Sequence, residues 1–287
     1  MPQAPSAASE NSKTAGMLPP VSLSVLTWKS PKTLKNTLKS LSRVKDIFSH
    51  RYVICQEGDP EEIRIAQAFG FKPVPTDKNL GIQEGLARCA DAAETELVLI
   101  VEGDNMLVSR DDARYLLNGA IHAMTKPEHD IKAFQLHQRD PKLSDRFLRY
   151  WHPKTPLKPT LMGRLRPGPA RARVHEALTL NDVAINGNEF IDKLERGIYL
   201  THSDCVNWCN RPFLTTRTFF LGELLPFARA NPGKKRVNGM PDLEHPICCP
   251  ANRHWWRGSR FRIGLLYPGI FEHNRLERNA DDEKTEL

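Results

Sequence analysis

The chain has 287 residues, of which 40% are apolar and 26% charged, a composition typical of a globular protein with ample core. No apolar run approaches the roughly 20 residues of a membrane span, and the start lacks the regions of a signal peptide, so we expect a cytoplasmic protein. A net charge of +7 favours anionic partners such as nucleotides, a membrane surface or nucleic acid.

Strands and helices alternate along the first hundred residues. Met1 to Pro20 is rich in alanine, serine and proline without periodicity, and we expect a disordered leader there. Apolar runs and capping residues then predict strands over 21–28, 52–55, 71–74 and 97–101, with helices over 31–44, 59–70 and 82–93. Such alternation is typical of parallel βαβ units. The sequence therefore predicts an α/β fold, with a mixed, mostly parallel sheet flanked by helices in a single main domain.

The second half of the chain carries weaker local signals. A helix is predicted to open at 109–112, and a strand is predicted over 131–137. Arg139 to Arg173 is basic and rich in proline, which predicts a loop whose arginines either face solvent or contact an anionic ligand. A helix carrying many phenylalanines is predicted from about Pro212 to Ala230, and the charged tail after Arg275 is expected to fray.

The most informative stretch is TELVLIVEGDNMLV at 95–108. Leu97 to Val101 is an unbroken apolar run, the pattern of a strand buried on both faces. Glu102, Gly103 and Asp104 follow it, at the edge where open α/β sheets bind ligands, and two acids around one glycine suit a divalent cation. The alternative is an acidic turn without a ligand.

Two common phosphate-binding signatures are missing from the sequence. No G-x-G-x-x-G follows the first strand, and the chain has no G-x-x-x-x-G-K-[ST] loop. A sugar-phosphate nucleotidyltransferase would also need a glycine-rich loop after the first strand, where Thr27, Trp28, Lys29 and Ser30 stand instead. These absences disfavour a Rossmann dehydrogenase and a P-loop enzyme, and they leave the nucleotidyltransferase as a weaker alternative.

Four segments in this order resemble the family 2 glycosyltransferases of the GT-A fold. They are VSLSVLTWKSP at 21–31, VICQEGDP at 53–60, DKNLGIQEGLARC at 77–89 and VEGD at 101–104. The last segment has Glu102 where the family's DxD metal motif usually has aspartate. The resemblance covers 21–108 and implies a nucleotide-sugar-binding half over 21–138, an acceptor-binding and catalytic half over 139–276, and a tail over 277–287.

For the donor, the resemblance implies contacts from the loops after the first strands. Thr27 and Glu57 would hold the base and ribose of the nucleotide, and the turn with Asn79 and Gly81 would lie beside it. A UDP-sugar is the favoured donor. The alternatives are a solvated loop acid for Glu57 and a turn former for Asn79.

For the metal, the resemblance implies that Glu102 and Asp104, around Gly103, bind Mn²⁺ or Mg²⁺ together with the donor diphosphate. His273, in the segment YPGIFEH, would be a third ligand and would favour Mn²⁺, whereas the alternative is a partly exposed histidine. A cation at this place would lower the barrier, because negative charge grows on the diphosphate as the sugar leaves.

For the acceptor, the resemblance implies a carboxylate base near the start of a later helix. We predict Glu244 as this base and Asp242 as the second choice, and the alternative for both is an acid that stabilises a helix start. Trp208, Trp255 and Trp256 are predicted to line the acceptor site, although burial in the core is the alternative for a tryptophan.

The predicted function is therefore a metal-dependent, inverting transfer of a sugar from a nucleotide-sugar donor to a glycan or lipid-linked acceptor. The basic surplus predicts peripheral association with the inner membrane face. A basic nucleic-acid-binding protein is the rival hypothesis, supported by the arginines of 164–173 and by Trp255 and Trp256, but no nucleic-acid motif is present and no nucleic-acid partner is expected.

Overall fold

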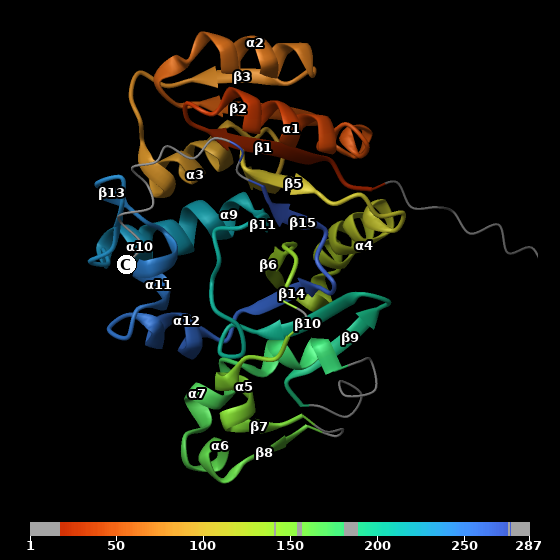
Figure 1. The fold of residues 1–287 in the computed structure, drawn as a ribbon, viewed down its shortest axis with the longest axis vertical. Helices are drawn as coiled ribbons and strands as arrows, with labels where there is room; N and C mark the ends of the chain where they lie inside the picture. The colour runs from red at the N-terminus through yellow and green to blue at the C-terminus, as the bar shows by residue number, and fades with distance from the viewer. Residues whose placement is uncertain (1–17, 141, 154–156, 181–188, 275, 277–287) are drawn as a thin grey trace, which may run out of the picture.

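A nine-stranded sheet runs through the molecule (Figure 1). The computed structural model describes residues 18–140, 142–153, 157–180, 189–274 and 276. The predicted tail over 277–287 and the predicted leader up to residue 17 lie outside the described residues. The strand order is β3-β2-β1-β4-β11-β6-β14-β10-β9. The predicted fold class, an α/β fold with a mixed sheet flanked by helices, is confirmed.

The first four strands form the parallel part of the sheet. β1 (Val21–Thr27) pairs with β2 (His50–Cys55) and β4 (Leu97–Glu102), and β3 (Lys72–Pro75) pairs with β2. The helices α1 (Pro31–Leu41), α2 (Pro60–Ala68) and α3 (Gly81–Ala92) connect them. The carboxylate of Asp59 accepts hydrogen bonds from the backbone N–H groups of Glu61 and Glu62, so the predicted cap of α2 is confirmed. The loops that follow β1, β2 and β4 meet at one edge of the sheet.

The remaining strands extend the same sheet across both predicted halves. β11 (Phe213–Thr216) runs antiparallel between β4 and β6 (Ile131–Gln135), and β14 (Arg262–Leu266) is parallel to β6. β10 (Ile198–His202) and β9 (Ile191–Glu195) complete the edge in antiparallel pairing. The two predicted halves therefore share one sheet.

Apolar side chains cover both faces of the sheet. Along β4, Leu97, Leu99 and Val101 belong to one buried cluster, with α1 and α4 (Ala113–Thr125), whereas Val98 and Ile100 belong to the other, with α3 and the helices of the second half. All five of these strand residues are buried. This alternation explains the unbroken apolar run, because a strand that is covered on both faces needs no polar side.

Two predictions for the second half are wrong. Residues 139–173 are not a loop, because they contain the short elements α5 (Asp145–Tyr150), β7 (Trp151–His152), β8 (Lys158–Pro159), α6 (Leu161–Leu165) and α7 (Pro167–Arg171). The helix predicted from Pro212 begins only at Arg217, as α9 (Arg217–Phe219), a π-helical turn (Phe220–Leu224) and α10 (Leu225–Ala230). Residues before it form β11, since the gap between β4 and β6 requires a strand to complete the hydrogen bonding there.

Small elements outside the sheet bring distant segments to the edge where β1 and β4 end. β5 (Asn105–Leu107), directly after β4, pairs with β15 (Phe271–His273) near the end of the chain. The hairpin of β12 (Arg236–Val237) and β13 (Met240–Pro241) contacts α3, and α11 (Glu244–Cys248) and α12 (Arg253–Ser259) follow it. In the part of the chain that the structure describes, no helix combines the length and apolar character needed to cross a membrane.

Candidate active site

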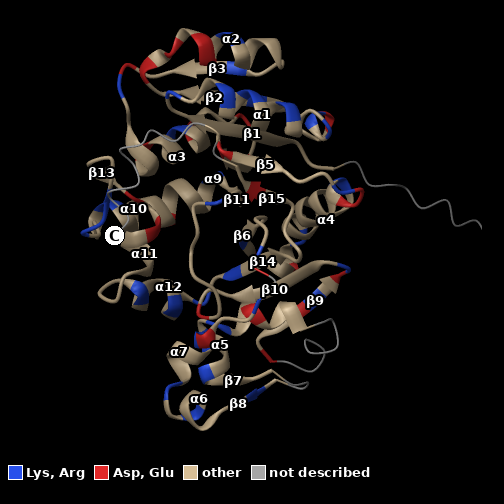
Figure 2. Ribbon diagram, in the orientation of Figure 1, with Lys and Arg blue, Asp and Glu red and all other residues tan. Residues whose placement is uncertain are grey.

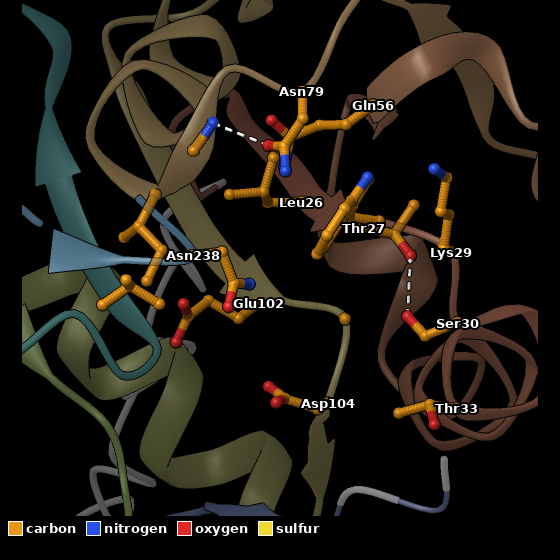
Figure 3. A pocket seen from close by; sticks show the side chains of 15 residues that line it. Leu26, Thr27, Lys29, Ser30, Thr33, Gln56, Asn79, Glu102, Asp104 and Asn238 are labelled. Atoms are coloured by element: carbon orange, nitrogen blue, oxygen red, sulfur yellow. Dashed lines mark hydrogen bonds between the residues drawn. The ribbon is translucent and has the colours of Figure 1, made fainter. Parts of the chain in front are cut away.

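A cavity of about 240 Å³ opens at the carboxyl ends of β1 and β4 (Figure 3). Six residues predicted for the donor and metal site line it: Thr27, Asn79, Gly81, Glu102, Gly103 and Asp104. Sequence reasoning missed further lining residues, among them Trp28, Lys29, Ser30, Thr33, Gln56 and Asn238. The structure thus gathers residues from five separate segments around one cavity.

The turn with Glu102 and Asp104 is hydrogen-bonded to neighbouring segments through Gly103. The Gly103 N–H donates a 2.7 Å hydrogen bond to the carbonyl of Leu26, and the Thr37 hydroxyl donates a 2.6 Å bond to the Gly103 carbonyl. A Cβ atom on Gly103 would lie 3.0 Å from the Leu26 carbonyl oxygen. A glycine is therefore needed for this close approach, which holds Glu102 and Asp104 at the cavity.

Asp104 and His273 meet across the β5–β15 pair. The Nε2 atom of His273 lies 2.9 Å from a carboxylate oxygen of Asp104, and the Asn274 N–H donates a 2.7 Å bond to the Asp104 carbonyl. Glu102 and Asp104 supply the oxygen ligands that Mg²⁺ and Mn²⁺ prefer, and the imidazole suits Mn²⁺. Among the described residues no three metal-binding side chains cluster closely enough to hold an ion by themselves. The set fits a cation whose remaining ligands are phosphate oxygens and water.

A buried acid that the sequence analysis overlooked shapes the loop after β1. Glu62 of α2 accepts hydrogen bonds through one oxygen from the Thr27 hydroxyl, at 2.7 Å, and from the Ser30 N–H, at 2.8 Å. Thr27 and Glu62 are both buried. The Thr27 hydroxyl thus has a structural partner, and the sequence offered only the acidic first turn of α2 as a signal.

Glu57 does not line this cavity. It is exposed, has a positive φ of 62°, and forms an ion pair with Lys29 at 2.5 Å, which holds its carboxyl pKa below the usual range. The neighbouring Gln56 lines the cavity instead, and its side-chain oxygen accepts a 2.7 Å bond from the Leu80 N–H. Gln56 thus lines the cavity and Glu57 does not, because the 3₁₀ turn after β2 directs Glu57 toward Lys29.

Asn79 lies across the cavity from Asp104 (Figure 3), and Gly81 also lines the cavity. The Asn79 side-chain oxygen accepts a 2.8 Å bond from the Gly81 N–H, the turn-forming contact considered as its alternative role. Gly81 has a φ of 72°, and a Cβ atom there would lie 2.5 Å from the Cβ atom of Met240. This packing brings the β12–β13 hairpin, with Asn238, to the rim of the cavity.

The two acids predicted as base differ sharply in surroundings. Asp242 is 5% exposed, and its oxygens accept bonds from the Asn210 amide and from the N–H groups of Glu244 and His245. Asp242 therefore stabilises the start of α11, the alternative role considered for it. Burial, followed by the charge of Asp242, raises the pKa of the Glu244 carboxyl. Neither acid lines the 240 Å³ cavity.

The predicted aromatic wall of the acceptor site is largely core. Trp208 and Trp256 are 2% and 1% exposed, their rings pack edge to face at 5.7 Å, and each indole N–H donates within the protein. Trp255 is half-buried and stacks on Phe227 with ring centroids 4.0 Å apart. Trp208 and Trp256 therefore do not reach a ligand, because the second-half helices need them to fill one face of the sheet.

Comparisons with known proteins give likenesses of fold. No protein-family model matches the chain, and no curated protein matches its sequence. Among solved structures, the chain is similar to glucosyl-3-phosphoglycerate synthase from Mycobacterium tuberculosis in complex with Mn²⁺, UDP and glucosyl-3-phosphoglycerate, at a TM-score of 0.48 and 14% identity, over 92% of this chain and 75% of that one.

Two further solved structures resemble a smaller part of the chain. One is the mannosyltransferase PcManGT from Pyrobaculum calidifontis in complex with GDP-Man and Mn²⁺, at a TM-score of 0.37 and 16% identity, over 43% of this chain and 36% of that one. The other is a TarS fragment from S. aureus, at a TM-score of 0.36 and 18% identity, over 47% of this chain and 41% of that one. The chain thus spans less than half the length of each of these two proteins, and these likenesses concern the fold alone.

Proposed function

We propose that the protein is a metal-dependent glycosyltransferase that moves a sugar from a nucleotide-sugar donor to an acceptor. The observation that carries the proposal is the single cavity in which Glu102 and Asp104 lie opposite Asn79, beside Thr27 and Lys29 (Figure 3). It sits at the edge where open α/β sheets bind ligands, and two carboxylates suit a divalent cation shared with a diphosphate.

Each part of the cavity supports one part of the donor. Glu102 and Asp104 would hold Mn²⁺ or Mg²⁺, which would neutralise the charge that grows on the diphosphate as the sugar leaves. Lys29 adds a positive charge at the mouth of the cavity, and Trp28 in the wall presents an aromatic side chain on which a nucleotide base can stack. His273 orients the Asp104 carboxylate through their 2.9 Å contact.

We assign the base of an inverting reaction to Glu244. A general base works best when its pKa approaches the working pH, and burial raises the pKa of this carboxyl. Its neighbour Asp242 accepts hydrogen bonds from the Asn210 amide and from the first two N–H groups of α11. Glu244 would remove the proton of the acceptor hydroxyl as that oxygen attacks the sugar.

Peripheral membrane association is part of the proposal. On α6, the side chains of Leu161 and Leu165 are 74% and 69% exposed, and Arg164 and Arg166 are exposed beside them. This helix lies at one end of the molecule (Figure 2). Exposed leucines among arginines suit an anionic lipid surface, where a lipid-linked acceptor would be found. We expect salt-reversible sedimentation with phosphatidylglycerol-containing vesicles, weakened in the double variant Leu161→Ser/Leu165→Ser. Absence of sedimentation at low salt would contradict this part alone.

The central test is ligand-dependent thermal stability. UDP or GDP with Mn²⁺ should stabilise the protein, by about 2.7 kcal/mol at a hundred times Kd. Asp104→Asn should lose this metal-dependent gain and keep its unliganded melting temperature, whereas the control Asp111→Asn, at an exposed acid of the following loop, should keep both. If no nucleoside diphosphate stabilises the wild type in the presence of Mn²⁺, the proposed function is wrong.

A further inference from the structure

A second cavity, of about 290 Å³, adjoins the candidate donor site. Its wall contains Asn105, His137, Gln138, Arg139, Arg211 and His273. The two cavities meet at the acidic turn: Asp104 lines the first, Asn105 and His273 line the second, and the Asn105 amide donates a 2.9 Å bond to Asp104. A molecule in the second cavity would therefore lie next to the proposed metal.

This cavity is lined by Arg211 and by three further segments that are far apart in the sequence. The end of β6 continues as residues 137–140 and is held against β15 by a 2.7 Å bond from the Gln138 N–H to the Phe271 carbonyl. β15 in turn pairs with β5. At Gly269, a Cβ atom would lie only 1.9 Å from the His137 carbonyl oxygen, so the segments approach as closely as a glycine allows.

Polar atoms in this wall are buried without a hydrogen-bond partner. They are Oδ1 of Asn105, Nδ1 of His137 and Nε of Arg139. Buried polar atoms in native proteins nearly always have partners, and several unpartnered ones in a single cavity point to a polar ligand. Because an amide oxygen accepts and a guanidinium nitrogen donates, the missing ligand should carry both a hydroxyl group and an acceptor oxygen.

Two arginines of this cavity, Arg139 and Arg211, lie beside two acids, Asp140 and Glu272, without pairing with them. Arg139 donates to the neutral side-chain oxygen of Gln135 at 2.8 Å, and among the described residues no carboxylate forms an ion pair with Arg139 or Arg211. Burial lowers the pKa of Arg139 to about 10, so its guanidinium stays charged at neutral pH. Arg211 and the two acids are exposed, whereas Arg139 is half-buried. Two arginines without carboxylate partners suit a phosphate or carboxylate group.

We propose that the second cavity binds the sugar acceptor, and that this acceptor carries a phosphate or carboxylate group held by Arg139 and Arg211. This inference rests on the proposed function. The anionic group would sit at the arginines, while the acceptor hydroxyl, near Asn105 and His273, faces the donor. In the transfer, the acceptor oxygen bonds to the anomeric carbon and the bond from that carbon to the phosphate oxygen breaks. The nucleoside diphosphate leaves with the electron pair, and the general base takes up the hydroxyl proton.

The test is titration calorimetry of the full chain with glycerol 3-phosphate at fixed ionic strength. We expect the wild type to bind it and not to bind glycerol, and we expect Arg211→Gln to weaken binding at least tenfold. The matched control is Lys29→Gln, which removes a cation from the first cavity and should leave the affinity unchanged. Arg139→Met should also weaken binding. Because Arg139 is half-buried, its replacement could affect folding, and stabilisation by UDP and Mn²⁺ verifies that this variant is folded.

The source of the anionic group is resolved by two further probes. Binding of glycerate would extend the acceptor class to carboxylates. Binding of phosphatidic acid in phosphatidylcholine vesicles, without binding of glycerol 3-phosphate, would identify a lipid-borne phosphate. The inference is overturned if no anionic probe binds, or if Lys29→Gln abolishes binding while Arg211→Gln does not. Stabilisation by UDP and Mn²⁺ is measured separately, so the proposed function can stand when this inference fails.

Discussion

The hydroxyl of Thr27 donates a 2.7 Å hydrogen bond to the carboxylate of Glu62, and both side chains are buried beside the candidate donor cavity. The same carboxylate oxygen accepts from the Ser30 N–H. One acid from α2 thus determines the path of the loop that follows β1, and it does so without lining the cavity. The donor site depends on a residue that need not touch the donor.

Replacing Glu62 with alanine should destabilise the fold. The change leaves the Thr27 hydroxyl and the Ser30 N–H without their partner, and an unsatisfied buried donor costs about 1–3 kcal/mol. We expect a loss of this size in the free energy of unfolding, measured by urea denaturation. The neighbouring exposed acid gives the control, since Glu61→Ala should change stability by less than about 0.5 kcal/mol. Equal stability of the two variants would contradict the structural role of Glu62.

Removal of the His273 imidazole should weaken metal-dependent nucleotide binding. His273 contacts Asp104 at 2.9 Å, and loss of a group that binds or orients a metal ligand typically lowers metal affinity about 10- to 100-fold. We expect His273→Ala to raise the Mn²⁺ concentration that is needed for stabilisation by UDP, measured by thermal shift across a metal titration. His254→Ala, at an exposed histidine of α12, should match the wild type. An unchanged Mn²⁺ requirement in His273→Ala would remove His273 from the site.

Glu244 and Asp242 should respond differently to amide substitution. Glu244→Gln should bind UDP and Mn²⁺ normally and transfer sugar about 10² to 10⁴ times more slowly, the usual effect of losing a general base. Asp242→Asn should chiefly lower the melting temperature, because Asp242 caps α11 and bonds to Asn210. Turnover rates, corrected for the folded fraction, separate the two effects. Near-normal turnover of folded Glu244→Gln would place the base elsewhere.

The ion pair of Glu84 and Arg229 should make a small, pH-dependent contribution to stability. Arg229 of α10 donates to the Glu84 carboxylate of α3 at 3.0 and 2.5 Å and lowers the carboxyl pKa below 4.5. A carboxyl group whose pKa is lower in the folded than in the unfolded state stabilises the fold at pH values above the unfolded-state pKa. This stabilisation is lost as the pH falls through the folded-state pKa. Because both side chains are partly exposed, about 0.2–1 kcal/mol is expected. Urea unfolding of wild type and Glu84→Gln should differ by this amount at pH 7, and the difference should disappear as the pH falls through the folded-state pKa of Glu84. A difference that persists in acid would refute the assignment.

Local sequence signals determined the parallel half of the protein. The apolar run of β4, the cap at Asp59 and the prolines at the starts of α1 and α2 act within a few residues, and the structure forms these elements within a few residues of the predicted bounds. Glu102 and Asp104 reach the edge of the sheet for a similar reason. The carboxyl ends of parallel strands lie together at one edge, whatever sequence follows each strand. Thr27, Asn79, Gly81, Glu102 and Asp104 line the cavity as a result.

Only the tertiary structure decided the rest. Phe213 to Thr216 became β11 because β4 and β6 left a gap that a strand fills, which no pattern within those residues records. The same holds for the pairing of β5 with β15, which sets His273 beside Asp104 across 169 positions of sequence, and for the cavity of Arg139 and Arg211. Strand pairing between distant segments depends on which backbone groups remain unpaired after the local elements form, and that is a property of the assembled sheet, not of any one segment.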